Sequence, residues 1–129
     1  MKVFSRKIIS RTTGEDLGDS SPWLHKNKEY IVLALNYFEG TGLDIYIQTE
    51  DHNEPRFMSV NGFEFINQNP PSSWVTVFSE SYGRKVMTVL PASWNYTSFF
   101  EDMENQDPKA IELFNKEVEQ MYREEGIIN

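Results

Sequence analysis

The chain has 129 residues, a length typical of one domain. It contains no cysteine, which excludes disulfides, thiolate metal sites and cysteine nucleophiles. Twenty acidic residues against twelve basic ones give a formal net charge of −8, which argues against a partner that is a nucleic acid or an anionic membrane. Aromatic residues make up 14%, too many for a disordered acidic tail. We therefore expect a single folded, acidic domain over residues 1–129.

The N-terminal segment differs in charge from the rest of the chain. Residues 1–13 hold four basic residues and no acidic one, a local charge of +4 that leaves −12 for the remainder. This segment lacks an apolar stretch of signal-peptide length, and no run of about 18 apolar residues occurs anywhere. We expect a cytoplasmic protein without a membrane span. The basic residues between Lys2 and Arg11 suit an edge strand that resists aggregation.

Two segments in the first half of the chain have strand patterns. Residues 30–35 form a continuous apolar run, as expected for a strand that is covered on both faces. In residues 43–48, apolar side chains alternate with Asp44 and Tyr46, a pattern typical of a half-buried strand. Residues 39–42 supply the glycines of a chain reversal, so the two segments predict an antiparallel hairpin.

Two further hairpins are expected. Residues 57–60 and 63–66 flank Asn61-Gly62, a pair that favours the positive φ angles of a type I′ turn. Residues 74–78 and 85–90 have strand-like composition, and the sequence Ser-Tyr-Gly-Arg joins them. Strands connected in this way by short turns predict a mostly antiparallel, meander-like sheet.

The last quarter of the chain has helical patterns. Ser98 and Glu101 have the spacing of a capping box, which predicts a short helix over residues 99–105. Asp107 followed by Pro108 is typical of the start of a second helix. Its apolar residues recur at steps of three and four and form one face: Ile111, Phe114, Val118, Met121 and Tyr122. That face needs a partner, so we expect an α+β fold in which a C-terminal amphipathic helix packs on one face of the sheet.

Few residues suggest catalysis or metal binding. His25 and His52 are the only histidines, and neither a nucleophile elbow nor a phosphate-binding glycine loop occurs. Residues 50–54 read Glu-Asp-His-Asn-Glu, which is rich in oxygen ligands, but the glycine and terminal glutamate of a calcium loop are missing. We expect a connecting loop there, no metal, no cofactor and no enzymatic activity.

The aromatic residues leave an alternative function open. Trp74 and Phe78 alternate on a predicted strand, which favours a place for both in the core. Aromatic side chains also line clefts that bind planar molecules. The candidates for such a cleft are Trp23, Trp74, Trp94, Tyr82 and Tyr96. A small-molecule-binding domain or a small enzyme that uses this cleft is the alternative.

Part of the chain resembles a known class of small proteins. The segments are Ser72-Ser-Trp-Val75 before two strands, Leu90-Pro-Ala-Ser-Trp94, Phe99-Phe-Glu-Asp102 and Asp107-Pro-Lys-Ala-Ile-Glu-Leu-Phe114. They resemble small acidic immunity proteins encoded beside bacterial polymorphic or contact-dependent toxins. The resemblance implies a protein that binds and neutralises a cognate toxin domain. Many such toxins attack nucleic acid, which implies a basic, nuclease-like partner.

An acidic face is the predicted contact with such a toxin. Between Glu29 and Gly83 the chain has eight acidic residues and a single basic one, Arg56. Charge complementarity of this kind accelerates association and favours the correct partner. The residues predicted to bind the toxin are Asp44, Tyr46, Glu50, Asp51, Glu54 and Glu64, with Tyr46 as an aromatic anchor.

Overall fold

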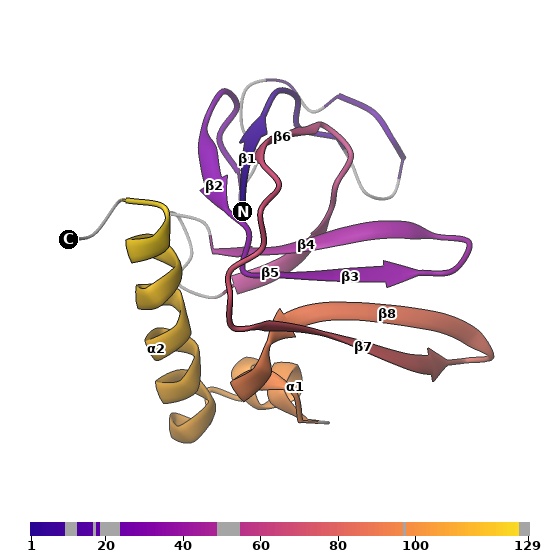
Figure 1. Cartoon of the computed structure of the whole chain (residues 1–129). Coiled ribbons are helices and arrows are strands. Elements are labelled where there is room, and N and C mark those ends of the chain that lie inside the picture. Colours follow the sequence, from indigo (N-terminus) through magenta and orange to yellow (C-terminus); the bar gives the residue numbers. More distant parts are fainter. Residues whose placement is uncertain (10–12, 17, 19–23, 49–54, 97, 127–129) are drawn as a thin grey trace.

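The computed structural model describes residues 1–9, 13–16, 18, 24–48, 55–96 and 98–126 (Figure 1). Its strands are β1 (Lys2–Ser5), β2 (Glu29–Ile31), β3 (Ala34–Phe38), β4 (Gly42–Gln48), β5 (Pro55–Ser59), β6 (Phe63–Asn67), β7 (Trp74–Ser81) and β8 (Arg84–Pro91). A short 3₁₀ helix, η1 (Ala92–Trp94), precedes the helices α1 (Phe99–Glu104) and α2 (Pro108–Glu124).

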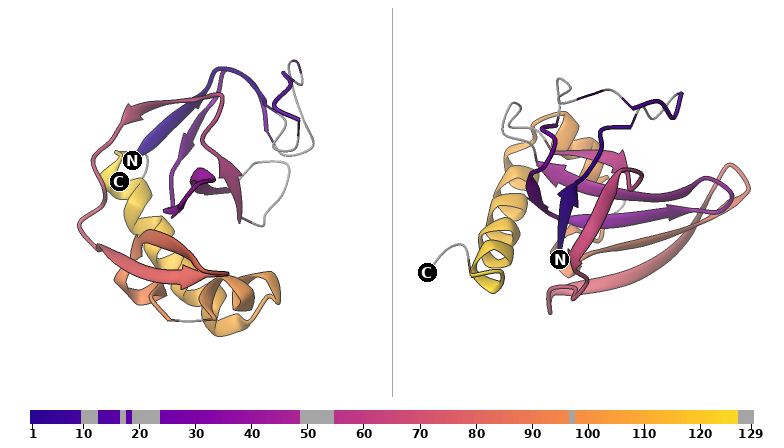
Figure 2. Two further views of the ribbon diagram at one scale, coloured as in Figure 1. Left: turned by 90° about the vertical axis from the view of Figure 1, so that its right-hand side faces the viewer. Right: turned by 90° about the horizontal axis from the view of Figure 1, so that it is seen from above.

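The strands form two antiparallel sheets rather than a single one. The smaller sheet has the order β2-β1-β6 and the larger sheet the order β5-β4-β3-β8-β7. Figure 2 shows the two sheets from two further directions, together with the helices. The α+β class and the C-terminal helix are confirmed. The single meander is wrong, because the chain passes between the sheets at three points: between β2 and β3, between β5 and β6, and between β6 and β7.

The first passage lies within the apolar run over residues 30–35. Val32 and Leu33 separate β2 from β3 and are almost fully buried. The amide of Val32 donates to the carbonyl of Met1 (3.0 Å), and the amide of Leu33 donates to the carbonyl of Tyr46 (2.8 Å). The run is apolar because its residues contribute to both cores: Tyr30 and Val32 pack between the sheets, and Ile31, Leu33 and Ala34 pack beneath the helices.

The second passage is the turn at Asn61-Gly62. The amide of Phe63 donates to the carbonyl of Val60 (3.0 Å), so a tight turn forms as expected. However, β5 pairs with β4 and β6 pairs with β1, so the turn joins two sheets and closes no hairpin. Only Gly62 of the central pair has a positive φ, +88°, which excludes type I′.

The other two hairpins form, although the first strand of the earlier one is Ala34–Phe38 and not residues 30–35. β3 pairs with β4 and β7 pairs with β8, both antiparallel and in continuous register. The type I′ signature occurs in the second of these, where Tyr82 and Gly83 have φ angles of 52° and 77°. They form a two-residue turn between the paired residues Ser81 and Arg84.

The turns at Gly62 and Gly83 differ in how closely the glycine approaches other atoms, which leads to a prediction about stability. A Cβ on Gly62 would lie 2.4 Å from the carbonyl oxygen of Lys7, whereas a Cβ on Gly83 would meet nothing within 4 Å. Gly83→Ala should therefore cost only the left-handed backbone strain, about 1–2 kcal/mol. Gly62→Ala should cost clearly more, because the backbone must also move. Urea unfolding of both variants measures the difference, and equal losses would show that the close approach is absent.

The N-terminal segment forms a central strand, so its expected place at an edge is wrong. β1 lies between β2 and β6, and the side chains of Val3 and Ser5 are fully buried. The hydroxyl of Ser5 donates to the carbonyl of His25 (2.6 Å) and accepts from the amide of Lys28 (3.1 Å). A buried hydroxyl with both kinds of partner fixes β1 against the segment before β2.

The two predicted helices are confirmed, with one change in capping. The carboxylate of Asp107 accepts from the amides of Lys109 (2.9 Å) and Ala110 (3.3 Å), as expected for the N-cap of α2. At α1, Ser98 is the N-cap residue, but its hydroxyl bonds to the carboxylate of Asp102 (3.1 Å) and caps no backbone amide. The capping box therefore does not form.

The five-stranded sheet separates two hydrophobic cores. On one face it packs against the helices, where Phe114, Val118 and Met121 of α2 meet Trp94 of η1. On the other face it packs against the smaller sheet. The residues buried between the sheets are Met1, Val3, Ile8, Leu24, Tyr30, Val32, Ile45 and Ile47. Both faces of β4 are consequently covered.

A buried ion pair ties the start of the chain to the end of α2. The amino group of Met1 lies 2.6 Å from the carboxylate of Glu125, and the two side chains are 8% and 10% exposed. The amide of Asn67 also donates to this carboxylate (3.2 and 3.3 Å). Burial raises the pKa of Glu125, but these bonds and the positive charge outweigh it, so the pKa lies below its ordinary value of 4.5.

This pair predicts a pH-dependent contribution to stability. Because the pKa of Glu125 is lowered in the folded state, the carboxylate stabilises the protein above the unfolded pKa and loses that effect as the pH falls through the folded pKa. Glu125→Gln should cost about 1–3 kcal/mol at neutral pH and progressively less in acid. Glu124→Gln, on the exposed side of the same helix end, is the matched control. A gap between the two variants that does not change with pH would contradict the assignment.

Candidate functional site

The predicted anchor of the toxin-binding face is buried. Tyr46 is 4% exposed, and its ring lies 4.5 Å from that of Phe57 and 5.0 Å from that of Phe100. Asp44 lies two residues before Tyr46 on the same face of β4 and is 8% exposed. The alternation in this strand does not separate buried from exposed residues, because the helices cover one face and the smaller sheet the other. The interpretation of Asp44 and Tyr46 as surface residues is therefore wrong.

The remaining predicted residues do not join Asp44 and Tyr46 in one described face. Glu64 is exposed on β6, but that strand belongs to the smaller sheet, whereas Asp44 belongs to the larger one. The carboxylate of Glu64 bonds to the guanidinium group of Arg6, which neutralises its charge locally. Glu50, Asp51 and Glu54 lie outside the described residues.

The predicted aromatic cleft does not form from the residues that the structure describes. Trp94 is fully buried, and its indole N–H donates to the carbonyl of Leu113 (3.1 Å). Tyr82 is fully exposed at the tip of a hairpin, and Tyr96 is 39% exposed with its ring against that of another aromatic residue. Trp74 packs against both cores, as the core interpretation expected. Trp23 lies outside the described residues.

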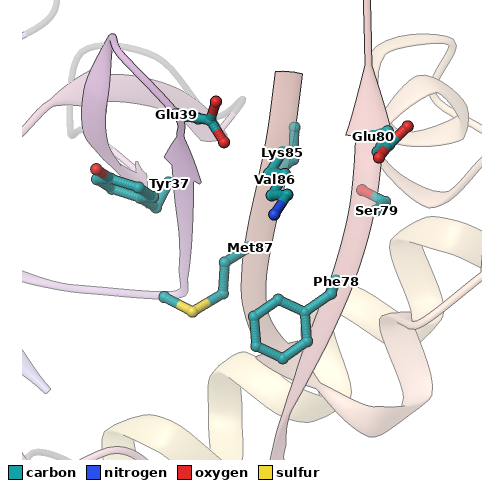
Figure 3. A pocket seen from close by; sticks show the side chains of 8 residues that line it. All are labelled: Tyr37, Glu39, Phe78, Ser79, Glu80, Lys85, Val86 and Met87. Atoms are coloured by element: carbon teal, nitrogen blue, oxygen red, sulfur yellow. The ribbon is translucent and has the colours of Figure 1, made fainter. Parts of the chain in front are cut away.

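A different surface stands out, on the larger sheet. Tyr37 of β3 pairs with Met87 of β8, and Met87 pairs with Phe78 of β7. Because directly paired residues point to the same face, the three side chains form one row across the sheet (Figure 3). Tyr37 is 44% exposed and Phe78 is 77% exposed. We call these three residues the apolar row. Phe78 is thus a surface residue, contrary to the core interpretation.

Charged residues border the apolar row. Two positions further along, Glu80 of β7 pairs with Lys85 of β8, and the amide of Glu39 donates to the carbonyl of Lys85 (2.9 Å). Figure 3 shows Lys85 between the two glutamates. The apolar row and this charged border line an open groove of about 800 Å³. The groove therefore has an apolar floor and a border with one net negative charge.

The arrangement of the layers explains why this surface is open. Figure 1 and Figure 2 show the β3–β4 and β7–β8 hairpins extending past both the helices and the smaller sheet. The face of the larger sheet that carries Ile45 packs on the smaller sheet. Farther along the hairpins, at Tyr37 and Phe78, the described part of the same face is uncovered. Tyr37 and Phe78 are therefore exposed on the same face as Met87, and contiguous apolar side chains of this kind mark a candidate interaction site.

Part of this site can be predicted from the sequence. Counting back from the Tyr82-Gly83 turn pairs Phe78 with Met87, so these two members of the apolar row could have been inferred from the third hairpin, whereas Tyr37 could not, because β3 and β8 pair over a long range. The exposure of the apolar row could not be inferred from the sequence, because it depends on where the smaller sheet ends. Sequence reasoning therefore missed the residues of the groove.

Other kinds of site find no support within the described residues. Across that part of the chain, no three histidine, aspartate or glutamate side chains gather in a way that could hold a metal ion. None of the described helices is both long and apolar enough to cross a membrane. Comparison of the chain with protein-family models, with curated proteins and with solved structures finds no match.

Proposed function

We propose that this chain is a cytoplasmic, protein-binding domain that acts as an immunity protein and neutralises a cognate bacterial toxin domain. The observation that carries the proposal is the apolar row, which presents Tyr37 and Phe78 to solvent on a rigid sheet. Aromatic side chains and methionine are enriched at the centres of protein interfaces. The paired strands already hold the backbone of these residues in place, so a partner that covers them orders their side chains but little of the backbone.

The charge of the chain indicates the kind of partner. A net charge of −8 on 129 residues attracts basic surfaces and repels other acidic ones. Glu39 and Glu80 place negative charge at the border of the apolar row itself. A basic, nuclease-like toxin domain would gain fast association from the overall field and specificity from this border.

The alternative function, a small-molecule site, has less support. Binding sites for small molecules enclose most of the ligand surface. The groove is instead open along a sheet face, and none of the described members of the predicted aromatic cleft lines it. A protein partner suits an open, apolar sheet face better than a small ligand does.

Co-expression tests the proposal. The C-terminal domain of the protein encoded by the neighbouring gene serves as the candidate toxin and is produced in the same cells as the chain, and growth and complex formation are measured. We expect protection of the cells and a stable one-to-one complex that can be purified. Failure to protect and to form a complex would remove that toxin as the partner.

The border charges predict an effect on the rate of association. The double variant Glu39→Lys/Glu80→Lys should lower the association rate constant for a basic toxin domain about 3- to 10-fold at low salt. Glu104→Lys/Glu112→Lys changes the net charge equally on exposed positions of the helices and should have a smaller effect. Stopped-flow measurements at two salt concentrations test this, and equal effects of both variants would exclude a specific role of the border.

A further inference from the structure

The two edges of the larger sheet differ in how well they are protected against pairing with another strand. β5, one edge, spans five residues and contains Pro55 and Arg56, which are typical of edges that resist pairing with other strands. β7, the other edge, spans eight residues and pairs with β8 in continuous register, without a bulge. It contains no proline or basic residue, and six of its eight residues are exposed. Among the described strands, none pairs with its outer side.

The turn at the end of β7 determines which backbone groups face outward. Ser81 and Arg84 flank a two-residue turn, so they form a hydrogen-bonded pair, and such pairs alternate along an antiparallel ladder. The backbone groups of residues 75, 77, 79 and 81 therefore face β8. The hydrogen bond from the amide of Ala92 to the carbonyl of Ser73 (2.8 Å) agrees with this alternation. The N–H and C=O groups of Thr76, Phe78 and Glu80 consequently point away from the sheet.

Two of the three residues with outward backbone groups, Phe78 and Glu80, also line the groove. Phe78 carries the exposed end of the apolar row, and Glu80 carries one end of the charged border. A strand added along β7 would extend the apolar row and the charged border by one residue each. Its residue opposite Phe78 would contact an apolar ring, and its residue opposite Glu80 would meet a carboxylate.

We propose that the partner adds a strand to the outer edge of β7, and that this strand carries an apolar residue and a basic residue two positions apart. This inference rests on the proposed function, because it specifies how the toxin domain contacts the apolar row. The backbone groups of Thr76, Phe78 and Glu80 provide the hydrogen bonds of the new ladder. The side chains of Phe78 and Glu80 select the apolar and the basic residue.

Charge favours a basic segment over a second copy of this chain. Two copies would each bring a net charge of −8 to the shared edge. A basic strand instead places a positive side chain beside Glu80, the only charged residue of β7. Opposite charges paired directly across two strands stabilise the ladder, whereas like charges destabilise it.

A peptide titration tests strand addition without the toxin. The probe is the peptide Thr-Lys-Thr-Val-Thr-Lys-Thr, which places valine and both lysines on one face of a strand in either direction. The control, Thr-Thr-Lys-Val-Lys-Thr-Thr, has the same composition but puts valine and the lysines on opposite faces. We expect the probe to bind the ¹⁵N-labelled full chain about fivefold more tightly than the control. The largest amide shifts should fall at Thr76, Phe78 and Glu80.

Two variants distinguish strand addition from contact by side chains alone. Thr76→Pro removes an outward N–H without removing a bond to β8 and should abolish binding, whereas Thr76→Val should retain it. Glu80→Lys should weaken binding of the probe and keeps the fold testable if the proline variant is unstable. Equal binding of both peptides, shifts centred elsewhere, or concentration-dependent shifts at these amides without peptide would overturn the inference. A toxin complex that depends on Phe78 but tolerates Thr76→Pro would overturn strand addition and leave the proposed function standing.

Discussion

Replacing Phe114 with alanine should lower the free energy of unfolding by about 3–5 kcal/mol. Phe114 is 4% exposed, and its ring stacks on that of Trp94 with a centroid distance of 5.5 Å. Trp94 in turn stacks on Phe99 at 4.9 Å, so the three rings join α2, η1 and α1. The truncated side chain would leave a cavity at the centre of the core beneath the helices.

Asn115→Ala is the control for this prediction. Asn115 neighbours Phe114 on α2 but is exposed, so its replacement should change stability by less than about 0.5 kcal/mol. Thermal and urea unfolding of both variants measure the two effects. A Phe114→Ala variant that melts close to the unsubstituted chain would show that α2 is not integral to the core.

Replacing Phe78 with serine should have the opposite profile: a large loss of binding with little loss of stability. Phe78 is 77% exposed, so its removal creates no cavity in the folded chain. In a complex, an aromatic anchor at the centre of an interface contributes about 2 kcal/mol or more, which corresponds to about a 30-fold increase in Kd. Calorimetry or surface plasmon resonance with the purified toxin domain measures the change.

Tyr82→Asn is the matched control for Phe78→Ser. Tyr82 is also a fully exposed aromatic residue of the β7–β8 hairpin, but it lies at the tip of the turn and outside the apolar row. Asparagine tolerates its positive φ of 52°. The control should leave Kd within about twofold, since surface substitutions outside an interface centre have small effects. A Kd that rises equally in both variants would remove the apolar row as the anchor.

Local patterns in the sequence predicted much of the fold. The stripe that contains Phe114 and Met121 marks the buried face of α2, and Asp107 caps this helix through its side chain. The β3–β4 and β7–β8 hairpins also follow from residues close in sequence. These elements are fixed by short-range chemistry, namely capping, turn geometry and the period of apolar residues.

The errors arose where distant parts of the chain compete for the same segment. Asn61-Gly62 has the composition of a hairpin turn, yet the flanking strands find better partners in β4 and β1. Asp44 and Tyr46 alternate with isoleucines as if one face of β4 met water, but a second layer covers that face. Tertiary packing overrode the local pattern in both cases.

The groove could not be predicted for the same reason. The pairing of Phe78 with Met87 follows from turn geometry, but the pairing of Tyr37 with Met87 joins β3 and β8, which are distant in sequence. An alternating strand with aromatic residues also has the same sequence whether its face is covered or open. Only the position of the smaller sheet and the helices relative to the hairpin ends decides that the apolar row is exposed.

Amide hydrogen exchange of the purified complex shows whether the apolar row forms the contact with a protein partner. Binding of the toxin domain should slow exchange at Tyr37, Phe78 and Met87 and leave the exposed face of α2 unchanged. Slowed exchange confined to α2 or β6, with these three residues unaffected, would contradict this prediction.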